Sequence, residues 1–206
     1  MSVSVARLLL EKKAVTLSLN RPFTWASGIR SPIYCDNRLL LSYPLERQKI
    51  IRGFVSLIRH HRLHCDGIAG VATAGIPHAA LLADRLKKPL IYVRSEKKGH
   101  GKGNQIEGRL DRGSSWIVIE DLMSTGGSSA KAVQAIRRSG GKVVACLAIF
   151  TYGLKEALTH FQDIRCPFYA LTDLQVLMKE ARRQEIISHH DQELLCRFQR
   201  DPHNWR

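Results

Sequence analysis

Five short apolar runs rich in β-branched residues alternate along this chain with segments of helical spacing. Such runs are typical of strands buried on both faces, and strands that alternate with helices form parallel sheets. We therefore expect an α/β fold with a central, mostly parallel sheet flanked by helices, and ligands beyond the carboxyl ends of its strands. The runs occupy residues 67–72, 90–94, 116–120, 143–150 and 168–171, and the helical segments occupy residues 45–61, 76–86, 128–139 and 154–161.

The length of the chain predicts a single domain, residues 1–206. With 206 residues and 44% hydrophobic content, one core can be filled well but two cannot. The α/β core should span residues 65–172, followed by a helical tail at 173–206. No apolar stretch approaches the roughly 18 uninterrupted residues that a membrane span requires, so we expect no membrane partner.

The cysteines indicate a reducing compartment. Five are present, an odd number without C-x-x-C spacing, which argues against a disulfide framework or a zinc ribbon. A cytoplasmic protein is therefore expected. They are Cys35, Cys65, Cys146, Cys166 and Cys196.

The charge of the chain favours anionic partners. It contains 32 Lys and Arg against 18 Asp and Glu, a formal net charge of +14. A field of this sign attracts nucleic acid, but it also concentrates small phosphorylated substrates. Charge alone does not choose between them, so the choice depends on the motifs.

The strongest motif is WIVIEDLMSTGGSS at residues 116–129, an apolar strand followed by two acids and a turn that opens a helix. Backbone N–H groups at 125–128 and the hydroxyls of Ser124, Thr125 and Ser128 can surround a phosphate at the positive end of the helix dipole. Glu120 and Asp121 can accept hydrogen bonds from a ribose diol beside it. The motif predicts a ribose 5-phosphate site, and neither a P-loop nor a dinucleotide-binding G-x-G-x-x-G motif competes with it.

A second segment, residues 95–108, has the composition of a mobile lid. SEKKGHGKGNQIEG contains four glycines and three lysines and has little to bury. It follows an apolar strand that ends in Arg94, and this position favours a functional loop over a solvated connector.

These motifs together resemble the type I phosphoribosyltransferases, and within them the orotate-specific branch in its short bacterial form. The phosphoribosyl pyrophosphate (PRPP) motif of that family is an apolar strand ending in two acids and a Thr-Gly-Gly-type turn, as at 116–129. The further matches, in the same order as in the family, are PFTWASGIRSPIYCDNR at 22–38, GVATAGIPHA at 70–79, YVRSEKKGHGKGNQIEG at 92–108 and IFTYG at 149–153.

The resemblance implies the type I phosphoribosyltransferase fold, with a small hood built from an N-terminal helix and a base-pocket segment at residues 1–40. It also implies roles for particular residues. PRPP would be bound by Glu120, Asp121, Leu122, Met123, Ser124, Thr125, Gly126, Gly127 and Ser128, and its pyrophosphate by the loop Ala72, Thr73, Ala74 and Gly75. Orotate would be bound by Ser124, Phe23, Ser27, Gly28 and Arg30.

The same resemblance implies that Arg94, Lys98 and His100 act in catalysis by closing over the pyrophosphate. In relatives the lid reaches the neighbouring subunit's site, which implies a homodimer. Displacement of pyrophosphate from the anomeric carbon passes through an oxocarbenium-like state, so catalysis chiefly stabilises a departing polyanion. We expect Mg²⁺ as cofactor, held through the substrate and water, with no direct ligand from protein side chains.

Two departures from the family pattern bear on the base pocket. Some branches have lysines at the positions of Ala26 and Ala74 and an arginine near Tyr152, and this sequence lacks all three. Arg30 is a candidate to replace part of this anion binding, with a surface position as the alternative.

Two other functions remain possible from sequence alone. One is a phosphoribosyltransferase for another base. The other is a regulator of the same fold that binds nucleic acid. A nucleic-acid partner is disfavoured because the lid keeps its cations and no added helix-turn-helix segment is present.

Overall fold

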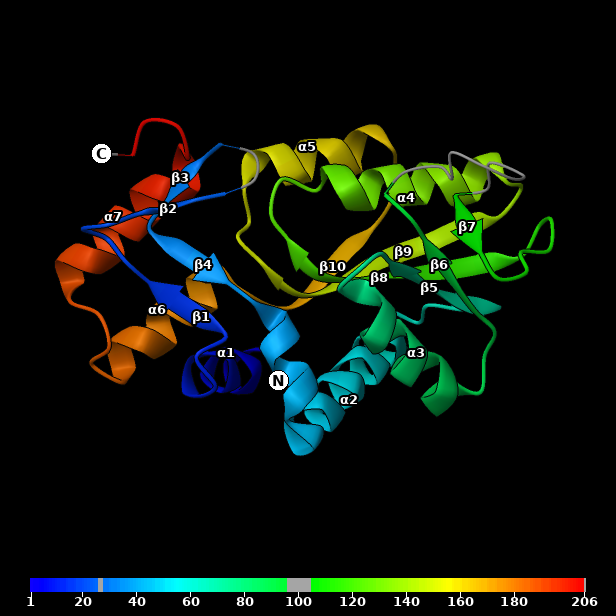
Figure 1. Ribbon diagram of the computed structural model, residues 1–206, viewed down its shortest axis with the longest axis horizontal. Coiled ribbons are helices and arrows are strands. Elements are labelled where there is room, and N and C mark those ends of the chain that lie inside the picture. The colour runs from blue at the N-terminus through cyan, green and yellow to red at the C-terminus, as the bar shows by residue number, and fades with distance from the viewer. Residues whose placement is uncertain (26–27, 96–104, 206) are drawn as a thin grey trace.

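The computed structural model describes residues 1–25, 28–95 and 105–205, and within them a six-stranded sheet covered by helices on both faces (Figure 1). Its strand order is β10-β9-β8-β5-β6-β7, and all neighbours are parallel except β7, which runs antiparallel to β6. The strands are β5 (Gly67–Val71), β6 (Leu90–Val93), β7 (Ile106–Glu107), β8 (Ser115–Met123), β9 (Lys142–Thr151) and β10 (Phe168–Asp173). The expected α/β fold with a mostly parallel sheet is confirmed.

The helices divide between the two faces of the sheet according to the two hydrophobic cores. The larger core includes side chains of α1, α2, α3, α6 and α7, and the smaller one includes those of α4 and α5. The helices are α1 (Ser2–Glu11), α2 (Pro44–His60), α3 (Gly75–Leu86), α4 (Gly127–Arg138), α5 (Lys155–Asp163), α6 (Leu174–Arg183) and α7 (His189–Arg200).

Strand β8 shows why the central runs are apolar without alternation. Ile117 and Ile119 face the larger core, and Trp116 and Val118 face the smaller one. Because successive side chains of a strand point to opposite faces, a strand covered on both sides must be apolar throughout.

The order of the strands creates a switch point between β5 and β8. The chain leaves β5 toward β6 on one side, and it returns to β8 on the other side of β5. Helix α3 follows β5 onto one face and α4 follows β8 onto the other, so the loops after these strands diverge. In open α/β sheets, this divergence leaves a crevice beyond the carboxyl ends of the two strands.

Short strands before residue 40 form two separate ribbons beside this edge of the sheet (Figure 1). Strand β1 (Val15–Leu17) pairs with β4 (Ile33–Cys35), and β2 (Phe23–Thr24) pairs with β3 (Arg30–Ser31). The 3₁₀-helix η1 (Asn37–Ser42) then leads into α2. This is the hood that the family resemblance implies.

The C-terminal segment packs against the hood. Trp205 is 5% exposed, its ring lies edge-on to Phe198 of α7, and its Nε1 donates to the carbonyl oxygen of Arg30 at 2.8 Å. The end of the chain therefore supports the strand that carries Arg30.

Among the described residues, no helix has both the length and the apolar character needed to cross a membrane. All five cysteines are free thiols.

Candidate active site

A cleft of about 400 Å³ opens at the switch point of the sheet. It lies where the loops after β5 and β8 meet the hood, as the strand order requires. Its lining comes from four parts of the chain: Trp25 and Tyr34, Cys35, Asp36 and Arg38 of the hood; Ala72, Thr73 and Ala74 after β5; Glu120, Asp121, Leu122, Ser124 and Ser128 of the motif; and Tyr152 after β9.

The two acids at the end of β8 are held differently. Glu120 is buried, and its carboxylate accepts hydrogen bonds from Ser129 Oγ at 2.8 Å and from the backbone N–H of Asp121 at 3.1 Å. Burial raises the pKa of Glu120 well above its usual range, and the adjacent Asp121 raises it further. Burial also raises the pKa of Asp121. Both shifts have the same main cause, the loss of hydration where the acids are buried.

The turn between β8 and α4 brings the first turn of α4 to the cleft. Gly126 has φ +82° and precedes the first residue of the helix, a conformation that favours glycine. A Cβ on Gly126 would also lie 3.2 Å from Cα of Ala157 in α5. The carbonyl oxygen of Thr125 lies 2.9 Å from His160 Nδ1, a further link to α5. Ser124 and Ser128 on either side of this turn line the cleft.

The loop after β5 forms the opposite wall. Ala72, Thr73 and Ala74 line the cleft, and the Ala72–Thr73 peptide bond is cis. Gly75 then begins α3, where a Cβ would lie 2.4 Å from the carbonyl oxygen of Ile119. Only glycine allows α3 to start this close to β8, so Gly75 sets the distance between the two walls.

Comparisons with known proteins agree with this geometry. Residues 40–175 match the model of the phosphoribosyl transferase domain. The chain belongs to the phosphoribosyltransferase family. It is 50% identical over 198 residues to an orotate phosphoribosyltransferase of Staphylococcus aureus, covering 96% of this chain and 98% of that protein.

Two solved structures are also similar to this phosphoribosyltransferase. The orotate phosphoribosyltransferase of Aeropyrum pernix superposes with a TM-score of 0.76 and 30% identity over 89% of this chain and 99% of that one. The UMP synthase of Leishmania donovani superposes with a TM-score of 0.82 and 28% identity. In that case the match covers 96% of this chain and 42% of the longer protein.

Most of the expected PRPP residues of the phosphoribosyltransferase lie on the cleft, but not all of them. Thr125, Gly126 and Gly127 are not part of the cleft lining, and Met123 is fully buried, with its side chain in the smaller core. The carbonyl oxygen of Met123 accepts a hydrogen bond from Thr151 Oγ1 at 3.2 Å. This bond fixes the motif to β9.

The expected base-pocket residues are distributed differently. Phe23 packs against Tyr34, and Gly28 and Arg30 are exposed, so none of these three is part of the cleft lining. The reason is the pairing of β2 with β3, which turns this ribbon toward α7 and Trp205. Ser27 lies outside the described residues.

Other residues line the side of the cleft that is formed by the hood and the loop after β9. They are Trp25, Tyr34, Asp36 and Arg38 of the hood and Tyr152 after β9, and the rings of Trp25 and Tyr152 are tilted by 35° with centroids 4.6 Å apart. The signal in the sequence was Asp36-x-Arg38, an acid and a cation two residues apart directly after a short strand.

Arg94 lies at the base of the expected lid and not in the cleft lining. Its backbone N–H donates to the carbonyl oxygen of Gln105 at 2.9 Å, and its guanidinium lies 3.5 Å from the carboxylate of Glu107. These contacts join the described residues on either side of segment 96–104. That segment, with Lys98 and His100, lies outside the described residues.

Proposed function

We propose that this protein is an orotate phosphoribosyltransferase. It transfers the 5-phosphoribosyl group from PRPP to orotate and yields orotidine 5′-monophosphate and pyrophosphate, a step of pyrimidine nucleotide synthesis. The observation that carries the proposal is 50% identity over nearly the whole chain to proteins of that name, combined with a cleft that brings an acid pair to a helix N-terminus.

In this proposal, each wall of the cleft binds a different part of the substrates. The backbone amides at the start of α4 and the hydroxyls of Ser124, Thr125 and Ser128 bind the 5-phosphate, and Asp121 with Glu120 binds the ribose diol. The loop from Ala72 to Gly75 offers backbone groups to the pyrophosphate. The adjacent rings of Trp25 and Tyr152 support the assignment of the remaining side to the base.

The reaction needs no protein nucleophile. A ring nitrogen of orotate forms a bond to the anomeric carbon as the bond from that carbon to the pyrophosphate oxygen breaks, and the electron pair leaves with pyrophosphate. Positive charge on the ribose and negative charge on the leaving group both grow in the transition state. Arg94, Lys98 and His100 are the groups that we assign to the leaving group, as a planar fork, a compact cation and a hydrogen-bond donor.

The cleft fits a Mg²⁺ ion that is bound mainly by the substrate. The oxygens of Glu120 accept bonds from Ser129 and Asp121, and those of Asp36 accept bonds from Arg38, so few carboxylate oxygens remain for a metal. No cluster of three or more metal-ligating side chains occurs within the described part of the chain. Mg²⁺ neutralises pyrophosphate charge when bound, and we assign its remaining ligands to substrate and water.

A homodimer in the cytoplasm completes the proposal. We assign the exposed apolar side chains of Leu39 (44% exposed), Leu45 (68%) and Leu81 (37%), on η1, α2 and α3, to the surface that a second copy would cover. Light scattering after size-exclusion chromatography tests the dimer. A monomer at micromolar concentration would contradict it.

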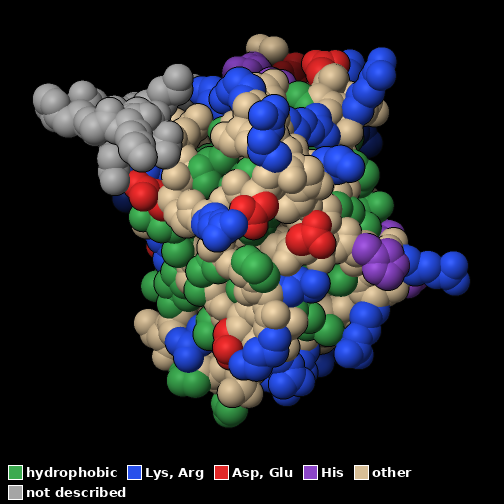
Figure 2. Space-filling view, turned by 90° about the vertical axis from the view of Figure 1, so that its right-hand side faces the viewer, with side chains coloured by type: hydrophobic (Ala, Val, Ile, Leu, Met, Phe, Trp, Pro, Cys, Tyr) green, Lys and Arg blue, Asp and Glu red, His purple; other side chains and the backbone are tan. Residues whose placement is uncertain are grey.

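The function itself is tested by incubating the protein with orotate, PRPP and Mg²⁺ and following the loss of orotate absorbance. Adenine, guanine, hypoxanthine and uracil, each in place of orotate, serve as the comparison, since consumption of one of these alone would assign the enzyme to another base. Figure 2 shows Lys and Arg side chains spread over one face rather than gathered in a single stripe. Retention on a nucleic-acid column at physiological salt without orotate turnover would favour a regulator instead.

Lys98 provides the first prediction for the mechanism. Lys98→Ala should lower the turnover number by about 100-fold or more while leaving orotate affinity within a few-fold, because the cation acts on charge that develops in the transition state. Steady-state kinetics and calorimetry with orotate measure the two quantities. An unchanged turnover number would remove Lys98 from the mechanism.

A further inference from the structure

Arg38 is a cation of the cleft to which the roles above assign nothing. It is the only Lys or Arg among the described residues that line the cleft, and its side chain is 61% exposed. It lies in the first turn of η1, directly after the hood strand β4. The other charged groups of the lining are the carboxyls of Asp36, Glu120 and Asp121.

Asp36 holds the guanidinium of Arg38 along one edge. Nε of Arg38 donates to Oδ1 of Asp36 at 2.6 Å, and Nη2 donates to Oδ2 at 2.9 Å. This bidentate pair lowers the pKa of Asp36 and raises that of Arg38, so both groups stay charged. The long arginine side chain is thus ordered before any ligand arrives, which lowers the entropic cost of binding.

The remaining edge of the Arg38 guanidinium, formed by Nη1 and Nη2, is a second pair of parallel hydrogen-bond donors. A guanidinium has five N–H donors, and Asp36 engages two of them. No acceptor among the described residues takes a hydrogen bond from Nη1. The Nη1 and Nη2 hydrogens on that edge match the spacing of two carboxylate oxygens, which is the arrangement that makes arginine–carboxylate recognition specific.

The substrate supplies the complementary group. Orotate differs from uracil by one carboxylate, and a buried carboxylate needs a cation and hydrogen bonds to offset its lost hydration. Arg38 lines the same cleft as Tyr34 and the tilted ring pair of Trp25 and Tyr152.

We propose that Arg38, oriented by Asp36, binds the carboxylate of the pyrimidine acid and thereby determines which base this enzyme accepts. The inference rests on the proposed function. Asp36 is a positioning residue, and it also accepts the backbone N–H of Arg38 at 3.1 Å as the cap of η1. That cap uses only the backbone of residue 38, so η1 does not need the arginine side chain.

The test compares Arg38→Ala and Arg38→Lys with the wild-type enzyme. Titration calorimetry gives the dissociation constants of orotate, of orotate carboxamide, which has a neutral amide in place of the carboxylate, and of PRPP. Arg109→Ala is the matched control, because Arg109 pairs with Asp111 two residues away at 2.9 Å but is 88% exposed outside the cleft. Thermal unfolding confirms that each variant is folded.

We expect Arg38→Ala to weaken orotate binding by about 10- to 100-fold, the usual effect of a lost charge-assisted pair. Its affinities for the carboxamide and for PRPP should stay within about twofold. Arg38→Lys keeps the charge without the fork, so it should lie between wild type and Arg38→Ala, and Arg109→Ala should match wild type.

Two results would overturn the inference. Orotate affinity within twofold of wild type in Arg38→Ala would remove the contact, and an equal loss for orotate, carboxamide and PRPP would show a distorted cleft rather than a carboxylate site. Failure of the wild-type enzyme to consume orotate would instead refute the proposed function. The two failures are therefore separate.

Discussion

At the scale of single residues, the adjacent acids of β8 are arranged for different tasks. Both oxygens of Glu120 are engaged by Ser129 and by the backbone of Asp121, so its carboxyl group fixes the turn into α4. Asp121 is partly exposed to the cleft, and its carbonyl oxygen accepts from Nδ2 of the buried Asn37 at 2.7 Å. We therefore expect Asp121, with its backbone anchored to the hood, to make the more exposed of the two contacts with the ribose diol, beside Glu120.

Asp121→Ala should weaken PRPP binding by about 10- to 100-fold, because hydrogen bonds from the ribose hydroxyls to a charged acceptor are lost. Calorimetry with PRPP and Mg²⁺ measures the change. Asp84→Ala is the control, since Asp84 pairs only with Lys87 on the surface of α3 and its side chain is 79% exposed. Equal affinities in the Asp121 variant and the wild type would show that the diol is bound elsewhere.

At the scale of elements, two helices that begin with glycine use it for different reasons. Gly75 begins α3 against the backbone of β8, where a Cβ would meet the carbonyl oxygen of Ile119 at 2.4 Å. Gly127 begins α4, and a Cβ there would meet nothing within 4 Å. The first glycine is required by packing, and the second leaves room for a ligand at the helix N-terminus.

Gly75→Ala should lower the free energy of unfolding by about 1–3 kcal/mol, because α3 has to move away from β8. Gly127→Ala is the matched comparison and should leave stability unchanged or raise it by up to about 1 kcal/mol, since alanine restricts the unfolded chain. Urea unfolding of both variants decides the matter. Equal effects at the two positions would contradict the packing argument.

Helix α3 also buries a histidine. His78 is fully buried, and neither ring nitrogen has a hydrogen-bond partner among the described residues. Burial lowers the pKa of His78 from 6.5 to about 4, and the charge of Arg47 adds to the effect. The unfolded chain therefore binds a proton between these two pH values when the folded chain does not, so folding loses stability as the pH falls from 6.5 toward 4.

His78→Leu should remove this pH dependence. The fall in the pKa of His78 from 6.5 to about 4 corresponds to about 3 kcal/mol of wild-type stability lost as the pH falls across this range. Urea unfolding at pH 7.5, 6, 5 and 4 should give a wild-type curve that falls relative to that of the variant. Parallel curves for the two proteins would show that His78 does not titrate on unfolding.

The sequence predicted the elements of the sheet better than those of the hood. The five runs from 67 to 171 are strands, because residues such as Ile117 and Val118 had to be apolar for both faces to be covered. The hood strands are two or three residues long, too short for any periodicity to appear. The pattern Asp36-x-Arg38 is visible in the sequence, but it does not show that the residues after β4 face the acids of β8, a neighbourhood that the fold creates through the contact of Asn37 with Asp121.

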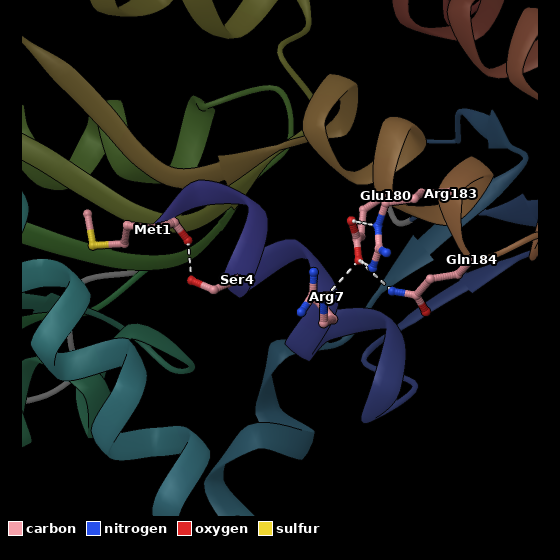
Figure 3. A network of polar contacts seen from close by, with 6 residues as sticks. All are labelled: Met1, Ser4, Arg7, Glu180, Arg183 and Gln184. Carbon is pink, nitrogen blue, oxygen red and sulfur yellow. Dashed lines mark hydrogen bonds and ion pairs between the residues drawn. The ribbon is translucent and has the colours of Figure 1, made fainter.

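At the scale of the whole molecule, one buried acid joins the N-terminal helix α1 to helix α6. Glu180 of α6 is 3% exposed, and its carboxylate accepts hydrogen bonds from Arg183 and Gln184 of the same region and from Arg7 of α1 at 2.9 Å (Figure 3). Because α1 packs on α6 and on β10, this contact ties the start of the chain to the sheet and to the C-terminal helices.

The bonds from Arg183, Gln184 and Arg7 hold the pKa of Glu180 far below its usual value of 4.5. A carboxyl group with a lowered folded pKa stabilises the fold above its unfolded pKa and loses that contribution as the pH falls. Glu180→Gln should therefore unfold at a lower temperature than the wild type at pH 7, and the difference should narrow below pH 4.5. Glu193→Gln, on the exposed face of α7, should match the wild type throughout.

The pH range in which Glu180 loses its contribution lies mostly below the range in which His78 acts, so melting curves between pH 7 and 3 separate the two groups. A difference that stayed constant with pH would mean that Glu180 acts through packing and not through its charge.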